Sequence, residues 1–364
     1  MTLPDRVLKS DYMHFAKTKS RARFNLATSG VADCTLDDLK LTLDDLALHG
    51  PNSYGYPPLT ELVAARFGVD PACVVMVGGG CSFANHLALA TMVAPGDRVL
   101  IEDPTYEIIQ STLGFLQAEL VPVVRRLEAA WALEMEGFVE KLTPGTRLVV
   151  LTNLHNPSSA LSSHAEIHAI ADRAAAVGAH VLVDEIYMEL MFRDGAAHSA
   201  FRPDGNIVIT SSLTKAYGLS GIRCGWILAP APLAERMRQL NNLYASLPPH
   251  ISERMGVVAF DRLPALRQRA DAMIDANRAS YRALLGNHPR LEQSVFDQGT
   301  TVFPKLIGAD VDALFERLTS TAETSFVPGR FFGRPQHLRI GLGADVAMTR
   351  TGLERLAEAL DALT

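Results

Sequence analysis

The sequence contains few cysteines, and they are not arranged in pairs. Four of them are scattered along 364 residues without a CxxC motif: Cys34, Cys73, Cys81 and Cys224. This spacing argues against a disulfide framework and against a zinc site, and it is typical of reduced thiols in a cytosolic protein. We therefore expect no metal ion, and we expect the protein to be cytoplasmic.

Long apolar runs and clusters of positive charge are also missing. No apolar stretch reaches membrane-spanning length, and the first residues, MTLPDRVLKSDYMHF, lack the apolar core of a signal peptide. The formal net charge is −6, and no Lys/Arg cluster offers a footprint for nucleic acid. The sequence thus predicts no membrane and no nucleic-acid partner, and its 48% hydrophobic content indicates a sizeable core.

The chain does contain a regular alternation of short apolar runs and helical stretches. Apolar runs typical of strands lie at 74–77, 98–101, 120–124, 147–151, 181–183, 207–209 and 225–228. Helical stretches separate most of them, and one has Ser163 as N-cap, Glu166 at the capping-box position and Gly178 at its end. This alternation predicts an α/β fold with a large, mostly parallel sheet flanked by helices.

The two ends of the chain have a different pattern. Residues 1–45 are mixed, with acids at 37–45 that suggest a solvated helix face, and residues 49–59 form a turn-rich loop. Helical stretches near 232–246, 251–260 and 265–285 precede strands near 300–306, 324–327 and 337–342 and a helix at about 348–362. We expect an N-terminal arm that includes part of a small domain (1–45), a large domain (46–247) and a smaller α+β domain (248–364).

The most informative stretch is IVITSSLTKAYGLSGIRCGW, residues 207–226. Lys215 follows a buried strand, where burial would favour the neutral amine, a nucleophile toward carbonyl groups. Ser212 and Arg223 are the kind of groups that bind a phosphate ester. Together these residues suggest pyridoxal phosphate, with its aldehyde on Lys215. A solvated lysine in a glycine-rich loop is the alternative.

Other polar residues follow neighbouring strands of the predicted sheet. The segment Gly80-Cys81-Ser82 opens a helix after the first strand, Asn156 follows the strand at 147–151, and Asp184 ends the strand at 181–183. Open α/β sheets bind ligands beyond the carboxyl ends of their strands. We expect these residues and Lys215 to converge on one edge.

This ordered set resembles the class I/II pyridoxal-phosphate aminotransferases of fold type I. The resemblance covers nearly the whole chain through these segments: Gly80-Cys81-Ser82, Pro95-Gly96-Asp97, Asp103-Pro104-Thr105-Tyr106, His155-Asn156-Pro157, Asp184-Glu185-Ile186-Tyr187, Ser212-Leu213-Thr214-Lys215 with Gly218, Gly221 and Arg223, and Leu338-Arg339-Ile340. It implies an enzyme that moves an amino group between an amino acid and a 2-oxo acid. The implied cofactor is pyridoxal 5'-phosphate.

The resemblance and the chemistry assign roles around the cofactor ring. Lys215 would form the internal aldimine and shuttle the substrate proton. Asp184 would keep the pyridine nitrogen protonated, so that the ring can accept electrons. Tyr187 and Asn156 would donate to the phenolate oxygen, and Tyr106 would stack on the ring. The expected catalytic residues are Lys215, Asp184 and Tyr187.

The phosphate and the substrate would be bound by further residues. The expected phosphate ligands are the side chains of Ser82, Ser212 and Arg223, the N–H groups of Gly80, Cys81 and Ser82, and, by resemblance, Tyr54 of a neighbouring subunit, which implies a homodimer. The α-carboxylate would be bound by Arg339, with Gly30 and Asn156 beside it. Strand alternation places Arg339 and Gly341 on one face, where the glycine leaves room for an anion. A salt bridge to an acid of the large domain is the alternative for Arg339.

Two departures from the family pattern concern the substrate. The family's Asn-Pro-Thr-Gly appears as Asn156-Pro157-Ser158-Ser159, and a glycine usual after the Tyr54 region is missing. The amino donor and acceptor therefore stay open, and a pyridoxal-phosphate lyase, decarboxylase or racemase is the nearest alternative.

Two further classes of protein compete with this hypothesis. Gly78-Gly79-Gly80 with Glu102 about twenty residues on suggests a dinucleotide-binding oxidoreductase, but Phe83 occupies the place of the third glycine. A regulator with an aminotransferase-like domain would need a DNA-binding module, and nothing before residue 45 has the length or charge of one.

Overall fold

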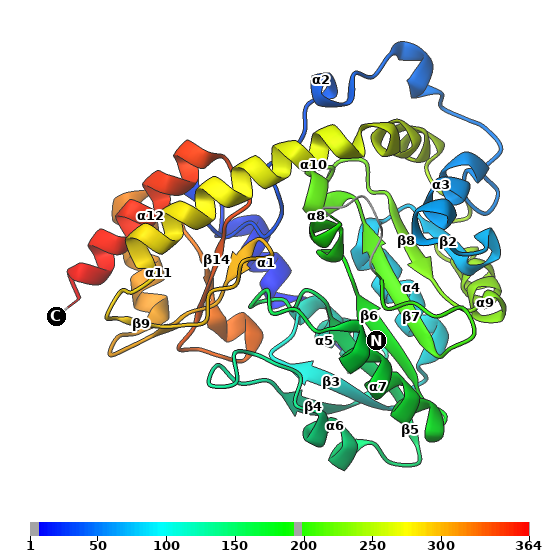
Figure 1. Ribbon diagram of the computed structural model, residues 1–364, viewed down its shortest axis with the longest axis horizontal. Helices are drawn as coiled ribbons and strands as arrows, with labels where there is room; N and C mark the ends of the chain where they lie inside the picture. Colours follow the sequence, from blue (N-terminus) through cyan, green and yellow to red (C-terminus); the bar gives the residue numbers. More distant parts are fainter. Residues whose placement is uncertain (1–6, 193–198, 364) are drawn as a thin grey trace, which may run out of the picture.

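The protein is built around a seven-stranded sheet, seen in a computed structural model that describes residues 7–192 and 199–363 (Figure 1). The strand order is β2 (Val74–Val77), β8 (Gly225–Leu228), β7 (Ile207–Ser212), β6 (His180–Asp184), β5 (Thr146–Thr152), β3 (Arg98–Asp103) and β4 (Glu119–Val124). Only β8 runs antiparallel to its neighbours. The mostly parallel α/β sheet predicted from the sequence is confirmed.

Helices cover both faces of this sheet, and strand residues alternate between two cores. Val74 and Met76 pack with side chains of α3 (Pro57–Phe67), α7 (His164–Ala176) and α10 (His250–Leu285). Val75 and Val77 pack with side chains of α4 (Gly80–Met92), α5 (Glu107–Phe115) and α9 (Ala231–Asn241). Strands buried on both faces are nearly all apolar, which is why the sequence shows them as continuous apolar runs. The short helices α6 (Met135–Lys141) and α8 (Thr214–Tyr217) complete this part.

The last third of the chain forms a second, smaller core. Strand β14 (Leu338–Gly341) lies between β10 (Thr301–Val302) and β13 (Val327–Pro328). Strands β9 (Leu291–Glu292) and β11 (Lys305–Leu306) pair separately. Helices α11 (Val311–Ala322) and α12 (Val346–Asp361) pack beside them at the left of Figure 1.

Helix α10 spans both parts of the molecule, where the sequence predicted two helices. It contains 36 residues and runs from α3 and α8 to α12 (Figure 1). Pro264 lies inside it and removes one backbone hydrogen bond. Ala259, Leu263 and Leu266 on either side of the proline are buried in the large core, and this packing holds the helix together across it. The domain boundary at residue 247 stays a prediction.

The N-terminal segment is an arm that lies between the two parts, and it is more ordered than the sequence predicted. It forms α1 (Asp11–Thr18) and β1 (Phe24–Asn25), and β1 pairs in parallel with β12 (Thr324–Ser325). The acids at 37–45 were expected on one solvated helix face. Instead, Asp38 and Asp45 complete capping boxes with Thr35 and Thr42 on two short helices, α2 (Leu36–Leu39) and a 3₁₀ turn at Leu43–Leu46.

Glycines let this arm approach the rest of the chain closely. A Cβ on Gly218, whose φ is +69°, would lie 2.2 Å from the carbonyl oxygen of Ala32, and one on Gly343 would lie 2.3 Å from that of Gly30. The amide of Val31 donates to Lys215 O over 2.9 Å. The arm is thus hydrogen-bonded to the segment that holds Lys215. None of the described helices has the length and apolarity to cross a membrane.

Candidate active site

A cavity of about 550 Å³ opens at the carboxyl ends of the parallel strands, next to the arm. Its wall contains most of the residues that the sequence singled out: Cys81, Ser82, Tyr106, Asn156, Asp184, Tyr187, Lys215 and Arg223. Ser212, Gly30, Gly80, Arg339 and Tyr54 lie outside this wall. The structure therefore brings the strand-end residues together, as their place in the sheet predicts.

Asp184 is a buried carboxylate held by three donors. Asn85 Nδ2–H donates to Asp184 Oδ2 over 2.7 Å, and the amide of Ile186 donates to Oδ1 over 3.0 Å. The Cys81 thiol lies 3.3 Å from the same Oδ1. Burial raises the pKa of Asp184, although these hydrogen bonds and the charge of Lys215 oppose the rise. No cation among the described residues forms an ion pair with this carboxylate, so a cationic ligand group would be stabilised beside it.

Lys215 lies on the cavity wall, partly accessible from the cavity. Burial lowers the pKa of its ammonium, and the positive charges of Arg339 and Arg223 lower it further. A lysine with a lowered pKa has more of the neutral amine that reacts with an aldehyde. A Cβ at Gly30 would lie 3.1 Å from Lys215 Cδ, so this glycine leaves space for the lysine side chain.

Three groups suited to a phosphate lie at one end of the cavity. Helix α4 directs its first amides toward it, and Ser82 and Arg223 line the wall beside them. The Gly80 amide is not available, because it donates to Arg223 O over 2.9 Å. Ser212 is fully buried, and its Oγ accepts from the Thr214 amide. Thr214 Oγ1, on the wall, is a buried hydroxyl without a partner among the described residues.

Arg339 lies behind the wall and is fully buried. Its guanidinium donates to Asn156 Oδ1 over 3.1 Å, to the hydroxyl of Tyr12 over 3.0 Å and to Ala27 O over 2.9 Å. The space expected beside Gly341 is filled, because the Gly341 amide bonds to Leu26 O and a Cβ there would meet Thr28 O. No described carboxylate lies within ion-pair distance of Arg339, so its charge meets neutral oxygens and the rings of Tyr12 and Phe332.

The remaining predicted residues occupy distinct places. Asn156 and Tyr106 line the cavity, and Tyr106 packs edge-on against Tyr12 with ring centroids 5.8 Å apart. Tyr187 donates its hydroxyl to Ser29 Oγ over 2.8 Å, and burial raises its pKa. Tyr54 is half exposed and lies away from the cavity wall of its own chain.

The departure at residues 158–159 preserves the backbone of the loop. Ser159 has φ +68°, a conformation that a glycine adopts without strain. Ser159 Oγ donates to Thr301 O over 2.8 Å. A Cβ on Gly299 would lie 2.3 Å from Ser159 Oγ. Hydrogen bonding and the space at Gly299 thus accommodate a serine at this strained position.

Several site residues were missed by the sequence analysis. Asn85 was missed, and Cys81 was predicted only as a phosphate ligand through its N–H group. The two residues are four positions apart on α4, so both face Asp184, and helical spacing could have indicated this. Tyr12 and Ser29 belong to the arm, whose position depends on contacts with the end of the chain. No local signal marks them. Met13, Ala16, Ser20, Arg21 and Asn25 of the arm also line the cavity.

The fold and the site define a class of protein, and comparisons with known proteins agree. A structure of a PLP-dependent aminotransferase from Streptococcus suis superposes with a TM-score of 0.88 at 22% identity, covering 100% of this chain and 99% of that one. This similarity shows that the chain has the same fold as that enzyme.

Sequence comparisons give the family. The profile of the family "Aminotransferase class I and II" matches residues 31–360. Capreomycidine synthase of Streptomyces vinaceus is 30% identical over 354 residues, covering 93% of this chain and 90% of the relative. Arginine–pyruvate transaminase of Pseudomonas aeruginosa is 28% identical over 299 residues, covering 78% and 73%. The chain belongs to the class I and II aminotransferases, and it is a pyridoxal-phosphate-dependent enzyme that transfers an amino group between an amino acid and a 2-oxo acid.

The residues present fit this cofactor. A phosphate suits the N-terminus of α4 with Ser82, Arg223 and the Thr214 hydroxyl, which has no hydrogen-bond partner among the described residues. A protonated ring nitrogen suits the carboxylate of Asp184, which accepts hydrogen bonds but forms no ion pair among those residues. The dinucleotide hypothesis is wrong, since Glu102 is fully buried and ion-paired with Arg125, out of reach of a ribose.

Proposed function

We propose that the enzyme performs transamination in this cavity, with Lys215 holding the cofactor and moving the substrate proton. The observation that carries the proposal is the presence of Lys215 and Asp184 on one cavity wall, a lysine with a lowered pKa and a carboxylate without a cationic partner. When bound, the cofactor supplies a ring that accepts the electrons released at the substrate Cα.

The predicted site residues and the groups that orient them have defined parts in this proposal. Asp184 holds the proton on the ring nitrogen, and Asn85 and the Ile186 amide orient Asp184. Asn156 and Tyr187 would face the ring's phenolic oxygen, and Tyr106 would cover one ring face. Lys215 would hold the cofactor and supply the amine that moves the substrate Cα proton.

The attachment site can be mapped chemically. Borohydride reduction of the holoenzyme followed by peptide mapping is expected to place a pyridoxyl group on Lys215. Lys215→Ala should bind the cofactor without a covalent bond and lose turnover, whereas Lys305→Ala, at an exposed ion pair with Glu292, should behave as the wild type. A reduced label on any other lysine would overturn the assignment.

For the substrate, we propose that Arg339 recognises the α-carboxylate. Its guanidinium has no acidic partner among the described residues, and its three acceptors, in Asn156, Tyr12 and Ala27, all belong to residues of the cavity wall. A carboxylate matches the planar fork of a guanidinium with two hydrogen bonds. The substrate side chain would then lie among the arm residues. Single-turnover spectra with a panel of amino acids, with product identification, would find the donor and would reveal a lyase or decarboxylase if the products differ.

We also propose that the enzyme is a homodimer. Exposed apolar side chains gather on two neighbouring segments, which are linked by the 2.6 Å bond from Asn52 Nδ2 to Pro248 O: Leu36, Leu43, Leu48, Tyr54, Leu243, Tyr244 and Leu247. Apolar patches of this kind are typical of association surfaces. A second copy would cover them and bring its Tyr54 to the phosphate end of the neighbouring cavity.

A hybrid experiment tests the shared site. Tyr54→Phe should weaken cofactor retention in the homodimer. A hybrid of Lys215→Ala chains with Tyr54→Phe chains contains one site with both an intact Lys215 and an intact Tyr54, so it should regain turnover and tight cofactor binding. A monomer in sedimentation, or a hybrid without recovery, would contradict the proposal.

All four cysteines are unpaired, which supports a reducing compartment such as the cytoplasm.

A further inference from the structure

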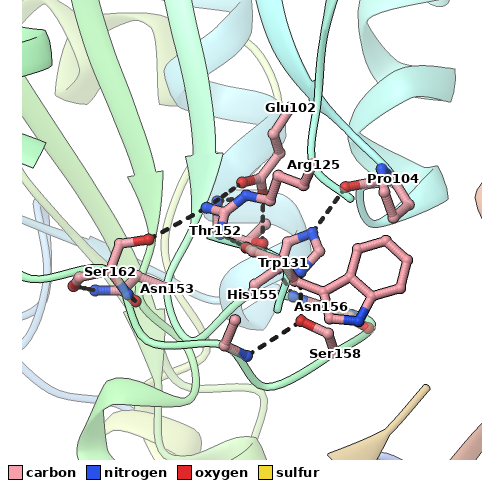
Figure 2. Close-up of polar contacts among 11 residues, drawn as sticks. Glu102, Pro104, Arg125, Trp131, Thr152, Asn153, His155, Asn156, Ser158 and Ser162 are labelled. Atoms are coloured by element: carbon pink, nitrogen blue, oxygen red, sulfur yellow. Dashed lines mark hydrogen bonds and ion pairs between the residues drawn. The ribbon is translucent and has the colours of Figure 1, made fainter. Parts of the chain in front are cut away.

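Behind the cavity lies a buried polar network that the catalytic roles above do not use. Glu102 on β3 is fully buried, and its Oε2 lies 2.7 Å from Arg125 Nη2, just past β4 (Figure 2). Taking both charges out of water is costly, and the attraction between them does not by itself make such a pair stabilising. Stability therefore does not explain why this ion pair is buried beside the active site.

The second carboxylate oxygen of Glu102, Oε1, fixes the end of strand β5. Glu102 Oε1 accepts the Thr152 amide over 2.6 Å and the Thr152 hydroxyl over 2.5 Å. Because the carboxylate can only accept, the hydroxyl proton of Thr152 must point at Glu102. The lone pairs of Thr152 Oγ1 then face the other way, and they accept the backbone N–H of Asn156 over 3.1 Å.

The side chain of Asn156, which lines the cavity, is also oriented by a hydrogen bond. Asn156 Oδ1 accepts from Arg339, so the amide group Nδ2–H₂ of Asn156 is the end left for the cavity. Asn156 is thus held from two sides. Arg125, Glu102 and Thr152 fix its backbone, and Arg339 fixes the oxygen of its side chain.

Arg125 is itself held so that it cannot turn away from Glu102. Its Nη1 donates to Trp131 O over 2.8 Å, and its Nη2 also reaches Ser162 Oγ at 3.3 Å. Burial raises the pKa of Glu102, and the charge of Arg125 and the bonds from Thr152 oppose that rise. The charge of Arg125 thus favours the carboxylate form that the network needs.

A second branch supports the same loop. His155 Nε2 lies 2.8 Å from Pro104 O, which can only accept, so this nitrogen carries the proton. His155 Nδ1 then accepts the Ser158 hydroxyl at 2.7 Å, in agreement with the strong lowering of the His155 pKa by burial and by Arg125. Figure 2 shows both branches meeting around the 152–158 loop, on either side of Asn156.

We propose that Glu102, held by Arg125, is a positioning residue that acts through Thr152 to aim the Asn156 side-chain amide at the cofactor's phenolic oxygen. The inference rests on the proposed role of Asn156. It assigns to Glu102 an indirect effect on the bound cofactor, because a donor at that oxygen stabilises its ionised form. Loss of the donor should raise the pH at which the bound cofactor changes colour.

The test is a spectroscopic pH titration of the holoenzyme, with Asn156→Ala as reference. We expect Asn156→Ala to raise the colour-change midpoint by about one pH unit, the effect of roughly one hydrogen bond. Thr152→Val and Glu102→Gln should raise it in the same direction. Thr152→Ser, which keeps the hydroxyl, should leave it unchanged. Ser162→Ala, which removes only the 3.3 Å bond to Arg125 Nη2 and keeps the bond to Trp131 O, should shift it less than Thr152→Val does.

Combined variants separate positioning from a general loss of structure. If Glu102 acts through Asn156, Thr152→Val/Asn156→Ala should show no larger shift than Asn156→Ala alone. Since Glu102→Gln leaves the charge of Arg125 unpaired, Glu102→Gln/Arg125→Gln is measured as well and should show the same raised midpoint.

The outcomes distinguish two failures. Wild-type midpoints in folded Glu102→Gln and Thr152→Val, or shifts that add to that of Asn156→Ala, would overturn the inference. An unchanged midpoint in Asn156→Ala itself would instead remove the proposed role of Asn156.

Discussion

Asn85 Nδ2 donates to Asp184 Oδ2 over 2.7 Å, while Asn85 Oδ1 accepts the hydroxyl of Thr210. The second bond fixes which end of the amide faces the carboxylate. Asp184 therefore receives a neutral donor that cannot turn around, and it keeps its negative charge for a ligand. This relationship leads to the first prediction.

Asn85→Leu should lower the rate about tenfold or more, since a hydrogen bond to a charged group is lost. Without that donor the pKa of Asp184 rises further, so the acidic limb of the pH–rate profile should move to higher pH. Thr210→Val, which removes only the outer bond, should have a smaller effect in the same direction. A profile that keeps its acidic limb in Asn85→Leu would show that Asp184 is held by its other donors.

Arg339→Lys tests carboxylate recognition. Lysine keeps the charge but loses the planar fork, so we expect KM for amino acids and 2-oxo acids to rise about tenfold or more, with the cofactor still bound. Reaction with simple amines, which lack the carboxylate, should change little. An unchanged KM, or a variant that loses its cofactor and unfolds, would assign Arg339 to structure instead.

Tyr12→Phe tests the missed tyrosine of the arm. Burial disfavours ionisation of Tyr12, but Arg339 and Lys215 outweigh it and lower the pKa of its hydroxyl. At high pH an ionised Tyr12 would pair with Arg339 and compete with the substrate carboxylate. We therefore expect substrate affinity to fall at high pH in the wild type and to lose that pH dependence in Tyr12→Phe, with a KM about tenfold higher at neutral pH.

The matched control for Tyr12 is Tyr281→Phe, because Tyr281 is buried and bonded to Gln293 outside the cavity wall. It should change stability and leave the pH dependence of KM intact. The interpretation of Tyr12 would be wrong if both variants kept the alkaline fall in affinity.

Glu253 predicts a pH dependence of stability. Burial raises its pKa from 4.5 to about 7, while its Oε2 accepts the Tyr56 amide over 3.0 Å. A raised carboxyl pKa means that the folded protein binds the proton more tightly, so this stabilisation is complete below pH 4.5 and is lost as pH rises through about 7. Between pH 4.5 and about 7, the free energy of unfolding of the wild type should fall by up to about 3 kcal/mol relative to that of Glu253→Gln.

Urea unfolding of both proteins at pH 5 and pH 8 measures this difference. An exposed substitution such as Glu61→Gln serves as control and should follow the wild type. Equal pH dependence in the wild type and Glu253→Gln would show that Glu253 titrates normally.

The sequence was informative where the site depends on strand ends. Asp184, Asn156 and Lys215 each follow an apolar run, and the topology of a parallel sheet brings such positions to one edge whatever the loops do. Tyr12, Ser29 and the burial of Arg339 could not be predicted in this way. They depend on where the arm lies, and its position is set by pairing with residues three hundred positions later, such as Phe24 with Thr324. Likewise the sequence predicted separate helices at 251–260 and 265–285, and tertiary packing on both sides of Pro264 joins them into α10.

The pairing of the arm with the end of the chain also bears on synthesis at the ribosome. Strands β2 to β8 are complete by residue 228, so the sheet that carries Asp184 and Lys215 can form early in translation. The arm, although made first, can already bond to the segment of Lys215, but it lacks its strand pairing until β12 at residue 324 has emerged, and Ala32 lacks its acceptor until Gly343 has emerged. The nascent chain therefore carries a reactive lysine in an open, incomplete site for nearly a hundred further codons, and an aldehyde cofactor that arrives early would meet Lys215 before Arg339 and Tyr12 are in place.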